Sequence, residues 1–374
     1  MVRGHIRRLR VAVVAPSLGI LGGQAVQADR LVRAWREDPE IDAWLVPVNP
    51  VPPGPLRAGV RVKYLRTVVT QLAYWPLLFR ELRHADVVHV FSASYFSFLL
   101  APLPAIVVAR LLGRPVLLNY RSGEAPDHLR RSAIARAAIR RVERNVVPSG
   151  FLRDVFATFG LRADVIQNIV NLDRFRFRAR RRLQPRLLST RNFETLYNVG
   201  CTLQAFRFVQ DRFPDASLTL VGDGAERGRL ESLARRLGLR NVIFAGRVAP
   251  EEIWRYYDEA DIYVQTPEID NMPASVLDAY ASGLAVVSTD AGGVPYILRH
   301  EREGLLAPHG DAGAVAGAVL RLLDTPELAA RLIAAGRAYA EDCSWERVRP
   351  QWVNVYRELA ASVPARIAVA EPSQ

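Results

Sequence analysis

The sequence predicts an α/β protein with two domains, each built around a parallel β-sheet. Its 374 residues are enough for two domains of ordinary size. Fully apolar strands such as Val11 to Ala15 alternate with amphipathic helical segments, which is typical of a parallel sheet covered on both faces. Each half also has glycines in a loop after a strand, Gly22 and Gly23 in the first half and Gly222 and Gly224 in the second. Glycine lets the backbone come close to a ligand, so we expect a binding surface at these loops.

Composition indicates a globular chain and excludes several classes of site. Half of the residues are apolar and 24% are charged, which excludes a disordered protein. The net charge is +12, and nearly all of the positive charge is arginine, since Lys63 is the single lysine. Such an excess fits anionic lipid or phosphorylated substrates, and we expect no nucleic-acid partner. Cys201 and Cys343 are too few and too isolated for a disulfide framework or a zinc site.

Two observations bear on the location of the protein. The N-terminus has basic residues and then a strand, without the apolar core of a signal peptide. The apolar run from Tyr95 to Gly113 contains two prolines and an arginine, which favours a buried helix over a membrane span. We therefore expect a cytoplasmic protein, with a peripheral contact at the inner face of the membrane as an alternative.

Further strands are predicted in the first half. They cover Ala43 to Val48, a segment around Val60 to Leu65, and Asp86 to Phe91. His89 lies inside the last of these strands and is interpreted as a core residue rather than a catalyst. Another strand starts at Pro115 and leads into a polar loop that contains Arg121. Open α/β sheets bind ligands at the carboxyl ends of their strands, so this loop is a candidate site.

An arginine-rich segment from Leu129 to Asn145 is predicted to form one helix. Its arginines spread around the helix among alanine, isoleucine and valine; they are Arg130, Arg131, Arg136, Arg140, Arg141 and Arg144. Either the helix is an ordinary solvated one, or it lies at a membrane surface and contacts anionic lipid. A basic run from Arg174 to Arg186 follows and marks the boundary between the domains.

The second half repeats the pattern of strand, glycine loop and helix. A strand from Leu218 to Val221 ends in Gly222-Asp223-Gly224, and an amphipathic helix follows. A second strand, Val242 to Phe244, leads to Gly246-Arg247-Val248. This arrangement is typical of one half of a nucleotide-binding fold.

The stretch from Glu268 to Gly283 joins a strand to a helix through an acidic loop. Pro273 is predicted at the first helical position, and Gly283 marks the helix end. Free N–H groups at such a helix start suit a phosphate or a diphosphate. Asp270 and Asp278 add carboxylates that can accept hydrogen bonds from hydroxyls of a sugar or a ribose. An ordinary strand–loop–helix with solvated acids is the alternative.

The same stretch resembles the E-G-x-P-x-x-x-x-E-A-x-A-x-G region of the GT-B glycosyltransferases of family 4 (glycosyl transferases group 1). Asp270 and Asp278 stand in its glutamate positions, and Asn271, Met272 and Pro273 fill the middle. The segments NVVPSGFL, VIQNIVNLDRF and LTLVGDG resemble other parts of the family pattern, so the resemblance covers nearly the whole chain.

The resemblance implies the GT-B architecture: two Rossmann-like α/β/α domains that face a central cleft, and a C-terminal helix that crosses back to the first domain. The expected divisions are residues 1–168 for an acceptor domain, 169–345 for a nucleotide-sugar domain, 346–362 for the crossover helix and 363–374 for a tail.

The resemblance also implies a function: a retaining hexosyltransferase that moves a sugar from a nucleotide diphosphate sugar to a glycan, lipid-linked or small-molecule acceptor. No metal and no cofactor are expected, because arginine and backbone N–H groups stabilise the leaving diphosphate. The catalytic residues carried over are Arg191, Asp270 and Arg121. The donor-binding residues carried over are Gly22, Gly23, Gly222, Gly224, Arg247, Asn271, Met272, Pro273 and Asp278.

Several family positions are altered. Arg121 stands where family members often have a histidine, and Tyr197 or Asn198 occupies the place of a lysine that usually holds the diphosphate. Two alternatives therefore stay open. One is a degenerate glycosyltransferase that binds a nucleotide sugar without turnover, and the other is a GT-B sugar-nucleotide epimerase.

Overall fold

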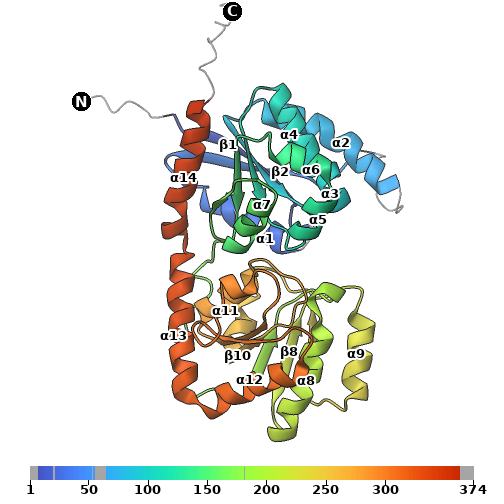
Figure 1. Cartoon of the computed structure of the whole chain (residues 1–374), viewed down its shortest axis with the longest axis vertical. Helices are drawn as coiled ribbons and strands as arrows, with labels where there is room; N and C mark the ends of the chain where they lie inside the picture. The colour runs from blue at the N-terminus through green and yellow to red at the C-terminus, as the bar shows by residue number, and fades with distance from the viewer. Residues whose placement is uncertain (1–6, 20–21, 53, 55–64, 181, 363–374) are drawn as a thin grey trace, which may run out of the picture.

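Two parallel sheets, one in each half of the chain, form the framework of the computed structural model, which describes residues 7–19, 22–52, 54, 65–180 and 182–362. Within the described residues, each sheet has six strands. The first has the order β2-β1-β3-β4-β5-β6 and the second the order β12-β11-β10-β7-β8-β9. Figure 1 shows the two α/β domains stacked along the long axis of the molecule. The predicted α/β class and the two-domain GT-B arrangement are confirmed.

The first domain has the strands β1 (Leu9–Ala15), β2 (Ile41–Pro47), β3 (Val87–Ser92), β4 (Val116–Tyr120), β5 (Arg144–Val147) and β6 (Asp164–Val165). Its helices are α1 (Gly23–Ala34), α2 (Leu65–Leu82), α3 (Tyr95–Leu100), α4 (Pro102–Leu111), α5 (Ala125–Arg131), α6 (Ala133–Ile139) and α7 (Gly150–Thr158). Alternate residues of β1 enter different cores. Val11 and Val13 pack in the core that includes α1, while Ala12 and Val14 pack in the core that includes α2 and α4. The sheet is therefore buried on both faces, as its continuous apolar strands predict.

The second domain has the strands β7 (Arg186–Ser189), β8 (Ser217–Val221), β9 (Val242–Gly246), β10 (Ile262–Val264), β11 (Ala285–Thr289) and β12 (Leu305–Ala307). Its helices are α8 (Val199–Arg212), α9 (Arg227–Arg236), α10 (Trp254–Glu259), α11 (Ala274–Ser282), α12 (Ala312–Asp324) and α13 (Pro326–Asp342), with 3₁₀ turns η2 (Thr195–Tyr197) and η3 (Val294–Tyr296). The basic run before this domain is tied to it, because Arg178, Arg180 and Arg186 all form ion pairs with Asp261, the residue before β10.

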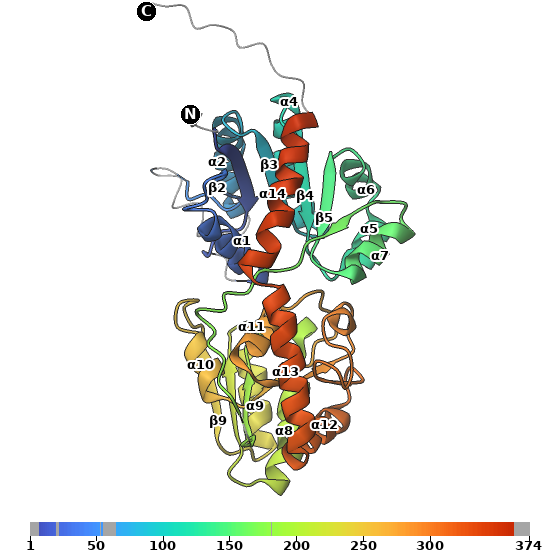
Figure 2. The ribbon, with the colours of Figure 1, turned by 90° about the vertical axis from the view of Figure 1, so that its left-hand side faces the viewer.

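The last helix, α14 (Trp345–Ser362), crosses back and packs on the first domain. Figure 2 shows α13 along the second domain and α14 continuing across the first. The rings of Trp345 and Trp35 meet edge to face with centroids 4.5 Å apart. The Tyr356 hydroxyl lies 2.7 Å from Nδ1 of His89 in β3. His89 is thus a buried core residue that joins the crossover helix to the first sheet.

The structure corrects three predicted elements and leaves one outside its range. The segment from Leu129 to Asn145 is not one helix, because Ser132 ends α5 and caps α6: its Oγ accepts a hydrogen bond from the backbone N–H of Ala135. Arg144 and Asn145 belong to β5. The expected helix from Tyr95 to Gly113 is divided into α3 and α4, with Pro102 starting the second.

Pro273 precedes α11 as its N-cap, with an extended backbone (φ −64°, ψ 117°), rather than occupying the first helical position. The expected strand around residues 60–65 lies outside the described residues except for Leu65, which begins α2. Among the helices that the structure describes, none combines the length and the apolar character needed to cross a bilayer.

Candidate donor-binding cleft

A cleft between the two domains brings together the residues predicted from far-apart parts of the sequence. Of the predicted site residues, the following line it: Gly22, Gly23, Arg121, Arg191, Gly222, Arg247, Asp270, Asn271, Met272, Pro273 and Asp278. Gly224 does not belong to this lining. The first domain supplies the start of α1 and the loop after β4, while the second supplies the loops after β7, β8 and β10.

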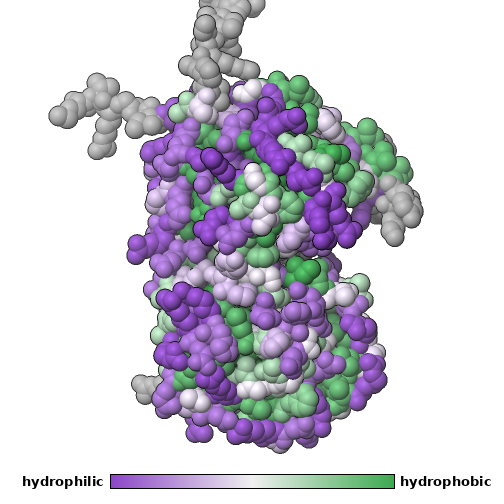
Figure 3. Space-filling model, viewed as in Figure 1, coloured by the Kyte–Doolittle hydropathy of each residue, from purple (hydrophilic) through white to green (hydrophobic). Residues whose placement is uncertain are grey.

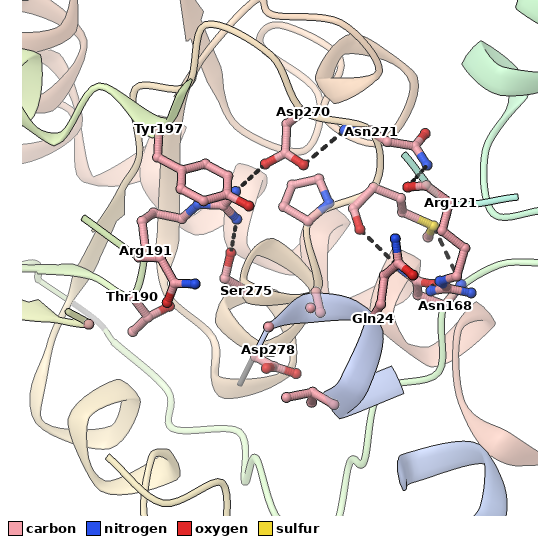
Figure 4. Close-up of a pocket in the computed structure, with 18 of the residues that line it drawn as sticks. Gln24, Arg121, Asn168, Thr190, Arg191, Tyr197, Asp270, Asn271, Ser275 and Asp278 are labelled. Atoms are coloured by element: carbon pink, nitrogen blue, oxygen red, sulfur yellow. Dashed lines mark hydrogen bonds and ion pairs between the residues drawn. The ribbon is translucent and has the colours of Figure 1, made fainter. Parts of the chain in front are cut away.

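Arg191 follows β7 and is held inside the second domain by three groups. Its Nη2 donates to Oδ2 of Asp270 at 2.6 Å, and its Nη1 donates to Oγ of Ser275 at 3.2 Å (Figure 4). The guanidinium also lies over the ring of Tyr197, 4.0 Å from its centroid. Burial alone would lower the pKa of Arg191, but the Asp270 carboxylate raises it above its usual value. Arg191 is therefore a fixed cation at the start of α11.

One N–H of this guanidinium has no partner in the part of the chain that the structure describes. Nε of Arg191 is buried and has no hydrogen-bond acceptor there. A buried donor without an acceptor costs free energy.

The glycines after β8 allow two loops to approach each other. Gly222 has φ +150°, and a Cβ on it would lie 2.2 Å from the carbonyl oxygen of Arg191. A Cβ on Gly224 would lie 2.4 Å from the carbonyl oxygen of Phe193. These glycines thus let the loop after β8 pack against the loop that carries Arg191. Gly224 acts through this contact, outside the cleft lining.

Asp278 of α11 forms a buried ion pair that the sequence did not predict. Its Oδ1 and Oδ2 accept hydrogen bonds from Nη1 and Nη2 of Arg30, at 3.0 and 2.9 Å. Arg30 lies on α1 of the first domain, and it also donates to the carbonyl oxygen of Ile169. Burial raises the pKa of Asp278, and the Arg30 guanidinium opposes this shift. The pair joins the domains at the inner end of the cleft, where both residues belong to the lining.

Arg121 approaches the cleft from the first domain without a carboxylate partner among the described residues. Its guanidinium lies over the ring of Phe91 and donates to the side-chain oxygens of Asn119 and Asn168. Burial lowers the pKa of Arg121 to about 9, so the group is charged at neutral pH. An unpaired buried cation that lines a cleft is suited to an anionic ligand.

The loop of Asp270, Asn271 and Met272 is bonded to the first domain. The Ser149 hydroxyl donates to Oδ1 of Asn271, and Nδ2 of Asn271 donates to the carbonyl oxygen of Arg121 at 3.3 Å. Nδ2 of Asn168 donates to the carbonyl oxygen of Met272 at 2.8 Å. The loop before α11 is therefore shaped by both domains, and Ser149 and Asn168 are positioning residues that sequence reasoning missed.

The remaining predicted residues lie at the edges of the cleft. Gly22 caps and Gly23 begins α1, and a Cβ on either would meet no atom of the described residues within 4 Å. Arg247 is largely exposed, with its Nε 3.7 Å from a carboxylate oxygen of Asp223. The described residues contain no cluster of three or more His, Cys, Asp or Glu side chains that could hold a metal ion.

Comparison with known proteins gives the family. Residues 173–339 match the family model for glycosyl transferases group 1, and residues 21–174 match the model for glycosyltransferase family 4. The chain belongs to glycosyltransferase family 4. The amylovoran biosynthesis glycosyltransferase AmsK of Erwinia amylovora is 31% identical over 166 residues, which are 42% of this chain and 41% of that protein. The chain spans about half the length of the curated relatives it matches.

Solved structures agree with the GT-B fold. The sucrose-phosphate synthase of Thermosynechococcus elongatus superposes with a TM-score of 0.74 at 20% identity, covering 95% of this chain and all of that one. The Anabaena protein Alr3699/HepE, solved in complex with UDP and glucose, superposes with a TM-score of 0.73 at 16% identity, covering 94% of this chain and all of that one. At these identities the likeness concerns the fold.

Proposed function

We propose that this family 4 protein transfers a hexose from a nucleotide diphosphate sugar to an acceptor and retains the anomeric configuration of the sugar. The observation that carries the proposal is Arg191. It is a buried cation with one unsatisfied N–H, held beside the start of α11. A helix start and a guanidinium that face one cleft form a site for a diphosphate.

In this proposal the cleft acts mainly on the leaving group. When the bond between the anomeric carbon and the phosphate oxygen breaks, its electron pair stays on the diphosphate. Arg191, the free N–H groups before α11 and Arg121 stabilise that charge, and no metal ion is needed. Asp270 faces the sugar, Asp278 faces the ribose, and the glycines at the start of α1 let the diphosphate approach the backbone. Closure of the domains excludes water from the reaction.

For the donor, uridine diphosphate sugars are the first candidates. The Anabaena neighbour is described in complex with UDP and glucose, and another of its structures contains UDP-glucose. For the acceptor we propose a glycan or a lipid-linked saccharide, handled by a cytoplasmic enzyme in peripheral contact with an anionic membrane. Polysaccharide or glycolipid synthesis is the corresponding process.

The first test is a thermal-shift screen of UDP-, GDP- and ADP-sugars. A ligand that binds only the folded protein raises the melting temperature, so the cognate donor should give the largest shift. Transfer of radiolabelled sugar to acceptor extracts then measures turnover, and proton NMR of the product reports the anomeric configuration. Absence of any shift with all three donor classes would contradict the proposal.

A second candidate is a degenerate glycosyltransferase that binds the donor without turnover. It is favoured by the pairing of both motif carboxylates with arginines, Asp270 with Arg191 and Asp278 with Arg30. The replacement of the family's lysine by Tyr197 or Asn198 also favours this candidate. Donor binding without transfer or donor hydrolysis would support this candidate, and conversion of the donor to its epimer would indicate the epimerase alternative.

A further inference from the structure

Helix α2 exposes a continuous apolar face. Five side chains spaced three and four residues apart lie on this face, with exposed fractions of 47% for Leu65, 55% for Val68, 63% for Leu72, 38% for Trp75 and 42% for Phe79. The spacing places them on one side of the helix. The opposite side is buried in the first domain through Val69, Tyr74, Leu78 and Leu82. We call the exposed set the α2 face.

Neighbouring helices extend this apolar surface. α2 is fixed to the junction of α3 and α4, because Gln71 donates to the carbonyl oxygen of Leu100 and Tyr74 to that of Ala101. These helices expose Phe96 and Leu111. Figure 3 shows hydrophobic residues gathered at the edge of the first domain over α2 and α4, away from the second domain.

The segment that carries the α2 face has an excess of positive charge. Residues 65–114, which contain α2, α3 and α4, include five arginines: Arg66, Arg80, Arg83, Arg110 and Arg114. The same range has two carboxylates, Glu81 and Asp86. Glu81 accepts a hydrogen bond from Arg80, and Asp86 pairs with Arg7 and with the backbone N–H of Arg10, at the far end of β1. An apolar face on an arginine-rich segment complements a surface that is apolar inside and anionic at its rim.

We propose that the α2 face docks on an anionic membrane. Leu72, Trp75 and Phe79 would enter the boundary between headgroups and acyl chains, and the arginines would lie at the level of the lipid phosphates. This docking would bring the cleft to a lipid-linked acceptor, and in that respect it rests on the proposed function. It replaces the arginine-rich segment of residues 129–145 as the membrane contact.

Most arginines of that segment are bonded within the protein. Arg130 and Arg131 both pair with Asp127, and Arg136 donates to the carbonyl oxygens of Leu129 and Arg130. Arg144 pairs with Asp164 and Glu358. The segment also has one largely exposed aliphatic side chain among its described residues, Ile134, so it offers little to insert.

Charge also argues against a second copy of the chain as the occupant. A two-fold contact between two α2 faces would bring Arg66, Arg80 and Arg83 of each copy near those of the other. Glu81 is the single acid of α2, and it already pairs with Arg80. Like charges face to face oppose such a dimer, whereas an anionic bilayer neutralises them.

The test is sedimentation of the full chain with vesicles of phosphatidylcholine alone or with one third phosphatidylglycerol. We expect binding to the anionic vesicles that weakens with added salt, and weak binding to the neutral ones. The double variant Leu72→Ser/Trp75→Ser should lose at least tenfold in partition. Leu72 is 63% exposed but Trp75 only 38%, so the melting temperature is measured as well, and the variant should remain folded under the conditions of the assay.

Two controls locate the effect. Ile243→Ser changes an equally exposed aliphatic side chain on β9 of the second domain and should leave partition unchanged. Arg130→Gln/Arg131→Gln tests the alternative basic segment and should also leave it unchanged. Undiminished binding by the α2 double variant, or no binding of the wild type, would overturn the proposal. So would a concentration-dependent dimer that the double variant abolishes, because the face would then serve a second copy.

The thermal shift with nucleotide sugars is measured on the same proteins without vesicles. If docking is lost in the double variant while the donor shift stays, the α2 face is a membrane site distinct from the cleft. If vesicles bind and no donor gives a shift, the proposed function fails and the docking surface stands.

Discussion

Arg191 is positioned before any substrate arrives. Asp270 and Ser275 accept its hydrogen bonds, and the Tyr197 ring supports the face of the guanidinium. A cation fixed in this way does not have to reorganise as charge develops on the leaving group, and this is how preorganised sites lower a barrier. Asp270 thus holds the charge and the orientation of Arg191, in addition to the role toward the sugar that we propose for it.

Replacing Arg191 should remove most of the turnover. Loss of one preorganised donor costs about 3–4 kcal/mol of barrier, on the order of a hundred- to a thousandfold in rate. Arg191→Lys should restore only part, because an ammonium cannot bridge two oxygens as a guanidinium does. Steady-state kinetics with the donor found by screening measures both variants. The matched control is Arg207→Ala, an exposed arginine of α8 that pairs with Asp211. An Arg191→Ala enzyme within a few-fold of the wild type would place the diphosphate elsewhere.

Some side-chain contacts in the cleft can be anticipated from the sequence, and others cannot. The family resemblance assigned Arg191 and Asp270 to one site, and the structure shows why they meet: they follow β7 and β10, which are neighbours in one parallel sheet. Arg30 and Asp278 are 248 residues apart and lie in different domains. No local pattern links these two, and the pair depends on how the domains are placed. The role of Gly224 likewise depends on a tertiary contact with Phe193.

Substitutions of Arg30 and Asp278 should lower the affinity for the donor. Asp278→Ala should raise the donor Kd with little effect on kcat, because the ribose hydroxyls lose an acceptor. Arg30→Gln leaves a buried carboxylate without its partner, and it should also weaken the donor. The effects of two substitutions at residues in direct contact are coupled by about 0.5–3 kcal/mol. The double variant Arg30→Gln/Asp278→Ala should therefore bind the donor more tightly than the summed losses of the two single variants predict. Isothermal calorimetry of the four proteins gives the coupling. Strict additivity would mean that the pair does not build the donor site.

At the scale of elements, apolar periodicity predicts strands better than it predicts helix boundaries. Buried strands such as β1 and β3 are continuous apolar runs, and they lie where the sequence places them. The break between α5 and α6 was missed although Ser132 is a good N-cap residue, because the helical pattern of alanine and isoleucine continues past it. The contact of His89 with Tyr356 joins β3 to α14, which the strand pattern alone does not show.

His89 makes the first domain sensitive to acid. Burial lowers its pKa to about 3, whereas an unfolded histidine titrates near 6.5. As the pH falls below about 6.5, the unfolded chain takes up a proton that the native state refuses. The free energy of unfolding therefore falls by about 1.4 kcal/mol per pH unit until the native histidine also titrates.

Urea unfolding of the wild type and of His89→Gln at pH 7.5 and pH 5.0 measures this effect. The variant should lose less stability between the two pH values. Some loss should remain, because burial also lowers the pKa of His128. His84→Gln, an exposed histidine two residues after α2, is the control and should behave as the wild type. An identical loss in His89→Gln and the wild type would contradict the assignment.

At the scale of the molecule, the cleft is held together from both sides. Buried contacts between the domains include Arg30 with Asp278, Asn271 with Ser149, and Asn168 with the carbonyl oxygen of Met272. The repeated strand–glycine–helix pattern and the family resemblance predict the two domains and the helix that returns to the first one. The distance between the domains follows from none of these, because it depends on tertiary contacts across the cleft.

Asn271 should control how far the cleft opens. Its side chain accepts a hydrogen bond from Ser149 and donates one to the carbonyl oxygen of Arg121, both in the first domain. Asn271→Ala removes two bonds of about 1 kcal/mol each, which lowers the ratio of closed to open molecules about thirtyfold. Small-angle X-ray scattering should show a larger radius of gyration for the variant without donor, and a return toward the wild-type value with saturating donor.

The matched control for this prediction is Arg33→Gln. Arg33 pairs with Glu251 across the same two domains at 3.3 Å, but both side chains are exposed to water. An exposed pair contributes about 0–1 kcal/mol, so this variant should keep the wild-type radius of gyration. The rate of sugar transfer gives a second readout, because a more open cleft admits water and misaligns the loop before α11. Asn271→Ala should therefore slow the transfer, and Arg33→Gln should leave its rate unchanged. Equal radii for Asn271→Ala and the wild type would mean that α13 and α14 alone set the distance between the domains.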